Sequence, residues 1–239
     1  MASKPGPGRC VHCLAYFDNR NWDHVFPKSW YPDTTPPNLA KWQIPTCYAC
    51  NEAYGKLEQD LLVRIALCLD SLIPETAGIV ARGLRSIDPN TAHSQNDINA
   101  RHAKLVQLRG DMLLGGLTPT EGIYPNFENQ WGGKAEDQGA IRVSADSIRK
   151  LTEKIVRGIH YLESKEYIEK PYAVTFFAIT DEDAMEITKT LKAHGERYAR
   201  EPGIEVLRIL APEDGNIAFY SITIFGKLNM YASVDCAVD

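Results

Sequence analysis

Four of the six cysteines stand in two pairs, each pair separated by two residues. Cys10 and Cys13 form the first pair, and Cys47 and Cys50 form the second. Each pair can place two thiolates on one tight turn, so two pairs can supply the four corners of a tetrahedral zinc site. A closed set of four sulfurs leaves no position for water, which makes the expected zinc structural rather than catalytic.

Disulfides and ordinary buried thiols are the alternatives to this metal site. The start, MASKPGPG, lacks the basic segment and apolar run of a secretion signal, and the paired spacing favours metal over both alternatives. Cys68 and Cys236 fall outside the pairs and are expected to be bystanders. His12 lies inside the first pair and is an alternative ligand to one of the cysteines.

A second group of chemically capable residues lies beside the cysteines: WDHVFPKSW at 22–30, between the pairs, and Asn51 directly after the second pair. Hydrolysis of a phosphodiester needs a base for water and a cation that stabilises charge on the phosphate. His24 has a suitable pKa for the first task, and Asp23 and Asn51 offer the oxygen ligands that Mg²⁺ accepts. Neighbours in a strand face opposite sides, so this pairing requires a bulge, a strand end, or a metal where the two faces meet.

These segments resemble the HNH endonucleases, also called ββα-metal nucleases. The family pattern is an Asp-His or Glu-His dipeptide, a hydrophobic-x-Pro stretch, a middle Asn, and a His or Asn directly after the second cysteine pair. DHVFPKSW and CYACN match this pattern, and Asn38 in PPNLAKW is the natural middle Asn. The resemblance covers about the first third of the chain.

The resemblance implies a function and a role for each residue. His24 would be the general base, Asp23 and Asn51 would bind a catalytic Mg²⁺ or Mn²⁺, and Asn38 would orient the imidazole. The implied activity is metal-dependent hydrolysis of phosphodiester bonds in DNA, with bacterial or phage defence as the setting. A non-catalytic zinc ribbon that binds nucleic acid or a protein is the alternative, and the pairing of Asp23 and His24 with Asn51 favours the nuclease.

Other charged residues near the motif have less specific interpretations. Glu58 is similar to an acidic residue often seen after the second cysteine pair, and a solvated helix charge is an equal alternative. Basic side chains surround the motif and are either phosphate contacts or ordinary surface charges, namely Arg20, Lys28, Lys41 and Lys56.

The elements that must position these residues can be read from hydrophobic spacing. Apolar residues recur at helical intervals from Leu57 to Leu69, before Pro74 ends the run. The segment SIDPN indicates a turn, with Asn90 or Thr91 as the cap of the next helix. Residues 115–139 are rich in Gly, Pro and Asn without periodicity, which predicts a linker and a domain boundary near residue 139.

The last hundred residues have the pattern of an α+β domain. A helix is expected over 144–163, with one face formed by Ile148, Leu151, Ile155, Ile159 and Leu162. A strand at 173–180, a helix over 181–201 and three strands at 205–210, 218–225 and 228–234 follow. The prediction is therefore an α+β chain with a nuclease module at 1–72, connecting helices and loop at 73–139, and an α+β domain with a mainly antiparallel sheet at 140–239.

Composition limits the remaining possibilities. The 239 residues are 44% hydrophobic and 24% charged, which is typical of a globular protein and predicts a cytoplasmic one without membrane partners. The net charge of -5 counts against tight non-specific binding to DNA, although a local basic face or a catalytic cation still permits it. The C-terminal domain would select the substrate, bind a protein partner or mediate oligomers.

Overall fold

A computed structural model describes residues 4–113, 140–177, 181–199 and 203–236. The chain is an α+β protein, as predicted, with a five-stranded antiparallel sheet in its C-terminal part. The predicted linker at 115–139 and the boundary near residue 139 lie outside the described residues. Among the helices in the described ranges, none combines the length and apolar character of a membrane span.

The N-terminal part is a ββα arrangement preceded by a small hairpin. Strands β1 (Gly8–Arg9) and β2 (Tyr16–Phe17) pair around the first cysteine pair. Strands β3 (Asn21–His24) and β4 (Gln43–Thr46) pair antiparallel, with the short helix η1 (Lys28–Trp30) between them. Helix α1 (Tyr48–Ala66) follows, so the helix predicted after the second cysteine pair begins within that pair.

Short helices connect this part to the rest of the chain. They are η2 (Pro74–Thr76), α2 (Ile79–Arg85), η3 (Pro89–Thr91) and α3 (Gln95–Asp111), followed by the strand pair β5 (Met112–Leu113) and β6 (Ala140–Ile141). The helix cap predicted at Asn90 or Thr91 is wrong. Both residues lie in η3, and the Ser94 side chain caps α3 by accepting from the Asp97 amide.

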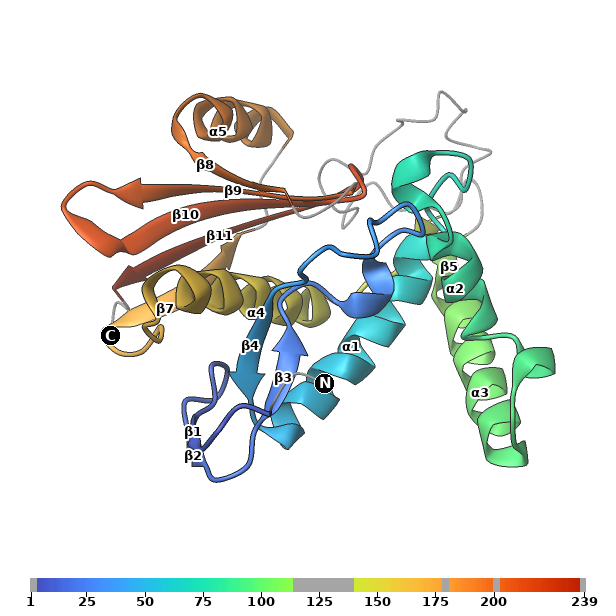
Figure 1. Cartoon of the computed structure of the whole chain (residues 1–239). Helices are drawn as coiled ribbons and strands as arrows, with labels where there is room; N and C mark the ends of the chain where they lie inside the picture. Colours follow the sequence, from blue (N-terminus) through green and yellow to red (C-terminus); the bar gives the residue numbers. More distant parts are fainter. Residues whose placement is uncertain (1–3, 114–139, 178–180, 200–202, 237–239) are drawn as a thin grey trace.

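The C-terminal part begins with α4 (Ala145–Ser164) and β7 (Tyr172–Phe177), followed by α5 (Asp181–His194). Four more strands complete the sheet, namely β8 (Glu196–Ala199), β9 (Ile204–Ala211), β10 (Asp214–Ile224) and β11 (Leu228–Cys236). The strand order is β7-β11-β10-β9-β8. Helices α4 and α5 lie on opposite sides of this sheet (Figure 1).

The predicted helix over 181–201 is too long. It ends at His194, and residues 196–199 form β8. This strand pairs with β9, with Glu196 opposite Arg208. Gly195 marks the change, because a Cβ there would lie 2.9 Å from the Arg208 carbonyl oxygen. The tight approach to β9 therefore ends the helix and starts a strand.

Helix α4 joins the sheet to the N-terminal part. One hydrophobic core contains buried side chains from both, including Val25, Phe26, Trp30, Leu61, Ile155, Ile159, Tyr220 and Ile222. The contact is close at Gly158, where a Cβ would lie 2.8 Å from Val25 Cγ2. The ranges 1–72 and 140–239, which the sequence predicts as separate modules, thus share one core.

Candidate metal centre and active site

The four paired cysteines converge on one point. Their sulfurs all lie within 4.8 Å of one another, and this is the one group of metal-ligating side chains of its kind in the described part of the chain. Cys47 also caps α1, because its sulfur accepts from the Cys50 amide at 3.3 Å. A turn and a helix start therefore present sulfurs to one small volume, which suits a metal such as zinc.

The thiols influence one another's protonation. Burial raises the pKa of Cys50, and the neighbouring Cys47, Cys10 and Cys13 raise it further. Burial acts the same way on Cys10, but backbone amides of Cys13, Cys47 and His12 outweigh it and lower that pKa. Four sulfurs at this spacing need a cation if all are to be thiolates, which is the form that binds metal.

A cavity of about 610 Å³ lies between β3, η1, α1 and α2, and one of its lining residues, Asn51, directly follows Cys50 of the cysteine cluster. The predicted site residues Asp23, His24 and Asn51 all line it, together with Glu58. Strand β3 ends at His24, so the strand end anticipated from the sequence lets neighbouring side chains reach one space. Asn51 and Glu58 are seven residues apart on α1 and share a helix face.

His24 is half-buried and contacts Gln43. Its Nε2 lies 3.1 Å from the Gln43 amide nitrogen, which can donate to it. With the Gln43 carboxamide turned over, its oxygen would instead accept a hydrogen bond from Nε2–H of His24. Nδ1 of His24 would then be the nitrogen that accepts a proton. Burial lowers the pKa of His24, Asp23 opposes this effect, and the cations Lys28, Lys154 and Lys41 add to the lowering. The imidazole is therefore neutral near neutral pH, as a general base must be.

Asp23 is buried and held from two sides. Its Oδ2 lies 3.3 Å from His12 Nε2, and its Oδ1 lies 3.2 Å from Lys154 Nζ. Burial alone would raise the pKa of Asp23, but His12 and Lys154 outweigh it and lower the pKa. Asp23 is thus a carboxylate near neutral pH. Each oxygen has two lone pairs and one protein partner, so the group can still bind a cation from the cavity side.

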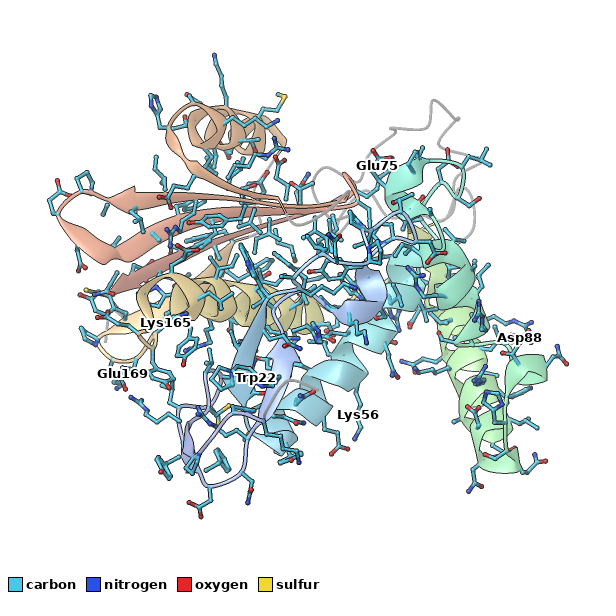
Figure 2. The ribbon with its side chains drawn as sticks, viewed as in Figure 1. Trp22, Lys56, Glu75, Asp88, Lys165 and Glu169 are labelled. Atoms are coloured by element: carbon cyan, nitrogen blue, oxygen red, sulfur yellow. The ribbon has the colours of Figure 1, made fainter. Side chains whose placement is uncertain are left out.

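Lys154 is a fully buried cation between two carboxylates. Its Nζ donates to Asp23 and to Glu58, and lies 5.6 Å from the centre of the Tyr54 ring. The exposed fraction of its side chain is 0%. Burial raises the pKa of Glu58, and Asp23 adds to this effect while Lys154 opposes it. Figure 2 shows side chains filling the space around α4 on the side of β3, where Trp22 is labelled.

The two asparagines of the predicted site differ in position. Asn51 lies at the start of α1, and its amide nitrogen donates to the Trp22 carbonyl at 3.4 Å, which leaves its oxygen for a ligand. Asn38 lies in an exposed turn and is not among the residues that line the cavity. The structure therefore places Gln43, and not Asn38, against the His24 imidazole.

Three basic side chains, those of Lys28, Lys41 and Arg82, line the cavity. Lys41 lies over the Tyr31 ring at 4.7 Å, and Arg82 pairs with Asp33. Of the four basic residues considered from the sequence, Arg20 binds backbone carbonyls near residues 6–9, and Lys56 pairs with Glu52. Lys28 and Lys41 are thus the two that reach the cavity.

Comparison of the chain with protein-family models, with curated proteins and with solved structures gives no match in any of the three. The likeness to HNH nucleases therefore rests on the residues and their spacing. What the structure adds is their spatial relation: the four cysteine sulfurs lie together, and Asp23, His24 and Asn51 line one cavity.

Sequence reasoning missed two residues of this site. Gln43 lies opposite His24 in the β3–β4 pairing, and nothing in its local sequence marks it. Lys154 could have been found, because it lies within the predicted apolar face of its helix, three residues after Leu151 and next to Ile155. A lysine in a buried stripe needs an acidic partner, and that partner is far away in the sequence.

Proposed function

We propose that this protein is a metal-dependent endonuclease of the HNH type that hydrolyses phosphodiester bonds in DNA. The observation that carries the proposal is one cavity shared by Asp23, His24 and Asn51, beside a cluster of four cysteines. The cysteines would hold a structural zinc that fixes β4 and the start of α1. The cavity would then perform the chemistry on an independently held scaffold.

The donor set suits a hard divalent cation. The Asp23 carboxylate and the Asn51 carbonyl oxygen would hold Mg²⁺ or Mn²⁺, which supplies charge stabilisation at the scissile phosphate when bound. The neutral imidazole of His24 would accept a proton from the attacking water. Lys28 and Lys41 would contact phosphates on either side of the cut, which compensates locally for the net charge of -5.

The non-catalytic zinc module is a second candidate, favoured by one observation. Both oxygens of Asp23 have protein partners, so this carboxylate already has a structural task. In that case the cavity, which Lys28, Lys41 and Arg82 line, would bind nucleic acid or an acidic protein segment without cutting it. The C-terminal part would bind a protein partner or another copy of the chain in either case.

The two candidates differ in one experiment. Purified, zinc-loaded protein is incubated with supercoiled plasmid DNA and either Mg²⁺ or Mn²⁺, with EDTA added to parallel samples. A nuclease converts the plasmid to nicked and linear forms only without EDTA. Retarded but intact plasmid under all conditions would support the non-catalytic module instead.

A further inference from the structure

Four separate segments of the chain meet behind the candidate active site. Asp23 comes from β3, Glu58 from α1, and Lys154 from α4. His12 comes from the loop between the first two cysteines, and its Nε2 contacts Asp23. His12, Glu58 and Lys154 are not among the catalytic residues expected from the sequence. Their contacts with Asp23 and with one another therefore need a separate physical explanation.

The two carboxylates are contacted by Lys154 on one side and line the cavity on the other. Asp23 and Glu58 both line the cavity, whereas Lys154 is fully buried and does not. Lys154 therefore contacts both carboxylates from the protein interior while they remain reachable from the cavity. The Tyr54 ring lies over both partners of Asp23, 4.5 Å from the His12 ring centre and 5.6 Å from Lys154 Nζ.

A buried lysine is costly unless its charge is matched. Removing an ammonium group from water carries a large desolvation penalty. A lysine is therefore rarely found in a core unless groups of opposite charge contact it. Here Asp23 is also buried and Glu58 is partly buried, and without a cation between them the two carboxylates would repel each other. Lys154 thus allows two negative groups to remain side by side at the cavity wall.

We propose that Lys154 is a positioning residue of the active site: from helix α4 in the C-terminal part, it holds the side chains of Asp23 and Glu58 side by side and oriented for a divalent cation in the cavity. This inference rests on the proposed metal-dependent function and extends it, because it makes the C-terminal part a component of the site. Lys154 itself does not contact the cation or the substrate.

A positioning role and a simple charge effect predict opposite changes in the affinity for a divalent cation. Replacing Lys154 with Met removes a positive charge near the cation site, and electrostatics alone would make a divalent cation bind more tightly. Positioning predicts the opposite, because Asp23 and Glu58 would lose the shared contact with Lys154 that orients both toward the cavity. The direction of the change in affinity therefore decides between the two.

The test is a titration of the full-length, zinc-loaded protein with Mn²⁺, followed by the electron paramagnetic resonance signal of free Mn²⁺. We expect Lys154→Met to weaken Mn²⁺ binding by about fivefold or more, with zinc content unchanged. Asn51→Ala should also weaken it, which locates the ion in the cavity. Ile155→Val, the neighbouring core residue on α4, should bind Mn²⁺ like the wild type.

A double variant makes the test specific for the contact. In Glu58→Gln, one of the two carboxylates is already neutral, so adding Lys154→Met should cost less than it does in the wild type, by about threefold or more. Unchanged or tighter Mn²⁺ binding in Lys154→Met would overturn the proposal, and so would a wild type that binds no Mn²⁺. Mn²⁺ binding without DNA cleavage would support the positioning role and count against the nuclease function.

Discussion

At the scale of single residues, the environment of His24 determines the pH at which the proposed reaction runs. The imidazole is half-buried, and three lysines lie close enough to disfavour its protonated form. Burial is the larger of these effects, and Asp23 only partly opposes them. The residue is thus neutral near neutral pH, as a general base must be.

The lowered pKa of His24 gives a prediction with a definite sign. Only neutral His24 can accept a proton, so kcat/KM should be constant at neutral pH and decrease as the pH falls through its pKa. Because that pKa is lowered from 6.5, the midpoint of the decrease should lie below 6.5. The midpoint can be measured from a pH profile of plasmid nicking over the range in which histidines titrate, about pH 5 to 8. A midpoint above 6.5 would contradict this assignment of the environment.

Local sequence was informative about the residues that act together in one motif. Asp23 and His24 lie between the two cysteine pairs and Asn51 follows the second pair directly, and all three residues line one cavity. Lys154 and Gln43 were not predictable in their roles, because each depends on a contact between segments distant in the chain. Asn38 shows the converse: its position in the motif was suitable, and the turn that carries it points to solvent.

At the scale of elements, the approach of α4 to the N-terminal part depends on Gly158. Alanine normally stabilises the interior of a helix relative to glycine by about 1 kcal/mol. At Gly158 a Cβ would meet Val25 at 2.8 Å, so α4 would have to move away from the segment that follows His24. Helix propensity and contact geometry therefore have opposite effects at this position.

We expect Gly158→Ala to lower the melting temperature and to reduce DNA cleavage, because the displacement of α4 also displaces Lys154. Gly110 in α3 is the matched control, since a Cβ there meets nothing within 4 Å. Gly110→Ala should leave cleavage unchanged and keep or raise the melting temperature. The comparison uses differential scanning calorimetry and plasmid nicking; equal behaviour of the two variants would refute the role given to Gly158.

Element prediction from sequence worked best where burial dominates. The apolar face of α4 was predicted correctly because nearly every member faces the core, including Leu151, Ile155 and Ile159. The prediction of α5 was too long, because residues 196–199 form a strand only through their pairing with β9. Helix propensity describes a segment by itself, whereas an edge strand depends on its neighbour.

At the scale of the whole molecule, one core joins the N-terminal part to the C-terminal sheet. Val25 and Trp30 from the N-terminal part, Ile155 from α4 and Tyr220 from β10 are all buried in it. A shared core couples the stability of its parts, so damage on α4 should be felt on both sides.

Ile155→Ala tests this coupling. Ile155 is 0% exposed, and its truncation should lower the free energy of unfolding by about 2 to 5 kcal/mol. Urea unfolding followed by tryptophan fluorescence should report mainly the N-terminal part, where three of the four tryptophans lie (Trp22, Trp30 and Trp42), while far-ultraviolet circular dichroism reports the whole chain. Both signals should shift together to lower urea. Separate transitions, with only the dichroism shifted, would mean that the two parts unfold independently.

The measurement that tests the central claim most directly is single-turnover plasmid cleavage by wild type and His24→Ala across a titration of Mg²⁺ and of Mn²⁺. Zinc content and circular dichroism are measured on the same samples, because the division of tasks requires the variant to keep its metal and its fold. Loss of a positioned general base should slow cleavage by about a hundredfold to ten-thousandfold at every metal concentration. Cleavage by His24→Ala at the wild-type rate throughout both titrations would contradict the assignment of His24 as the base and favour the non-catalytic zinc module.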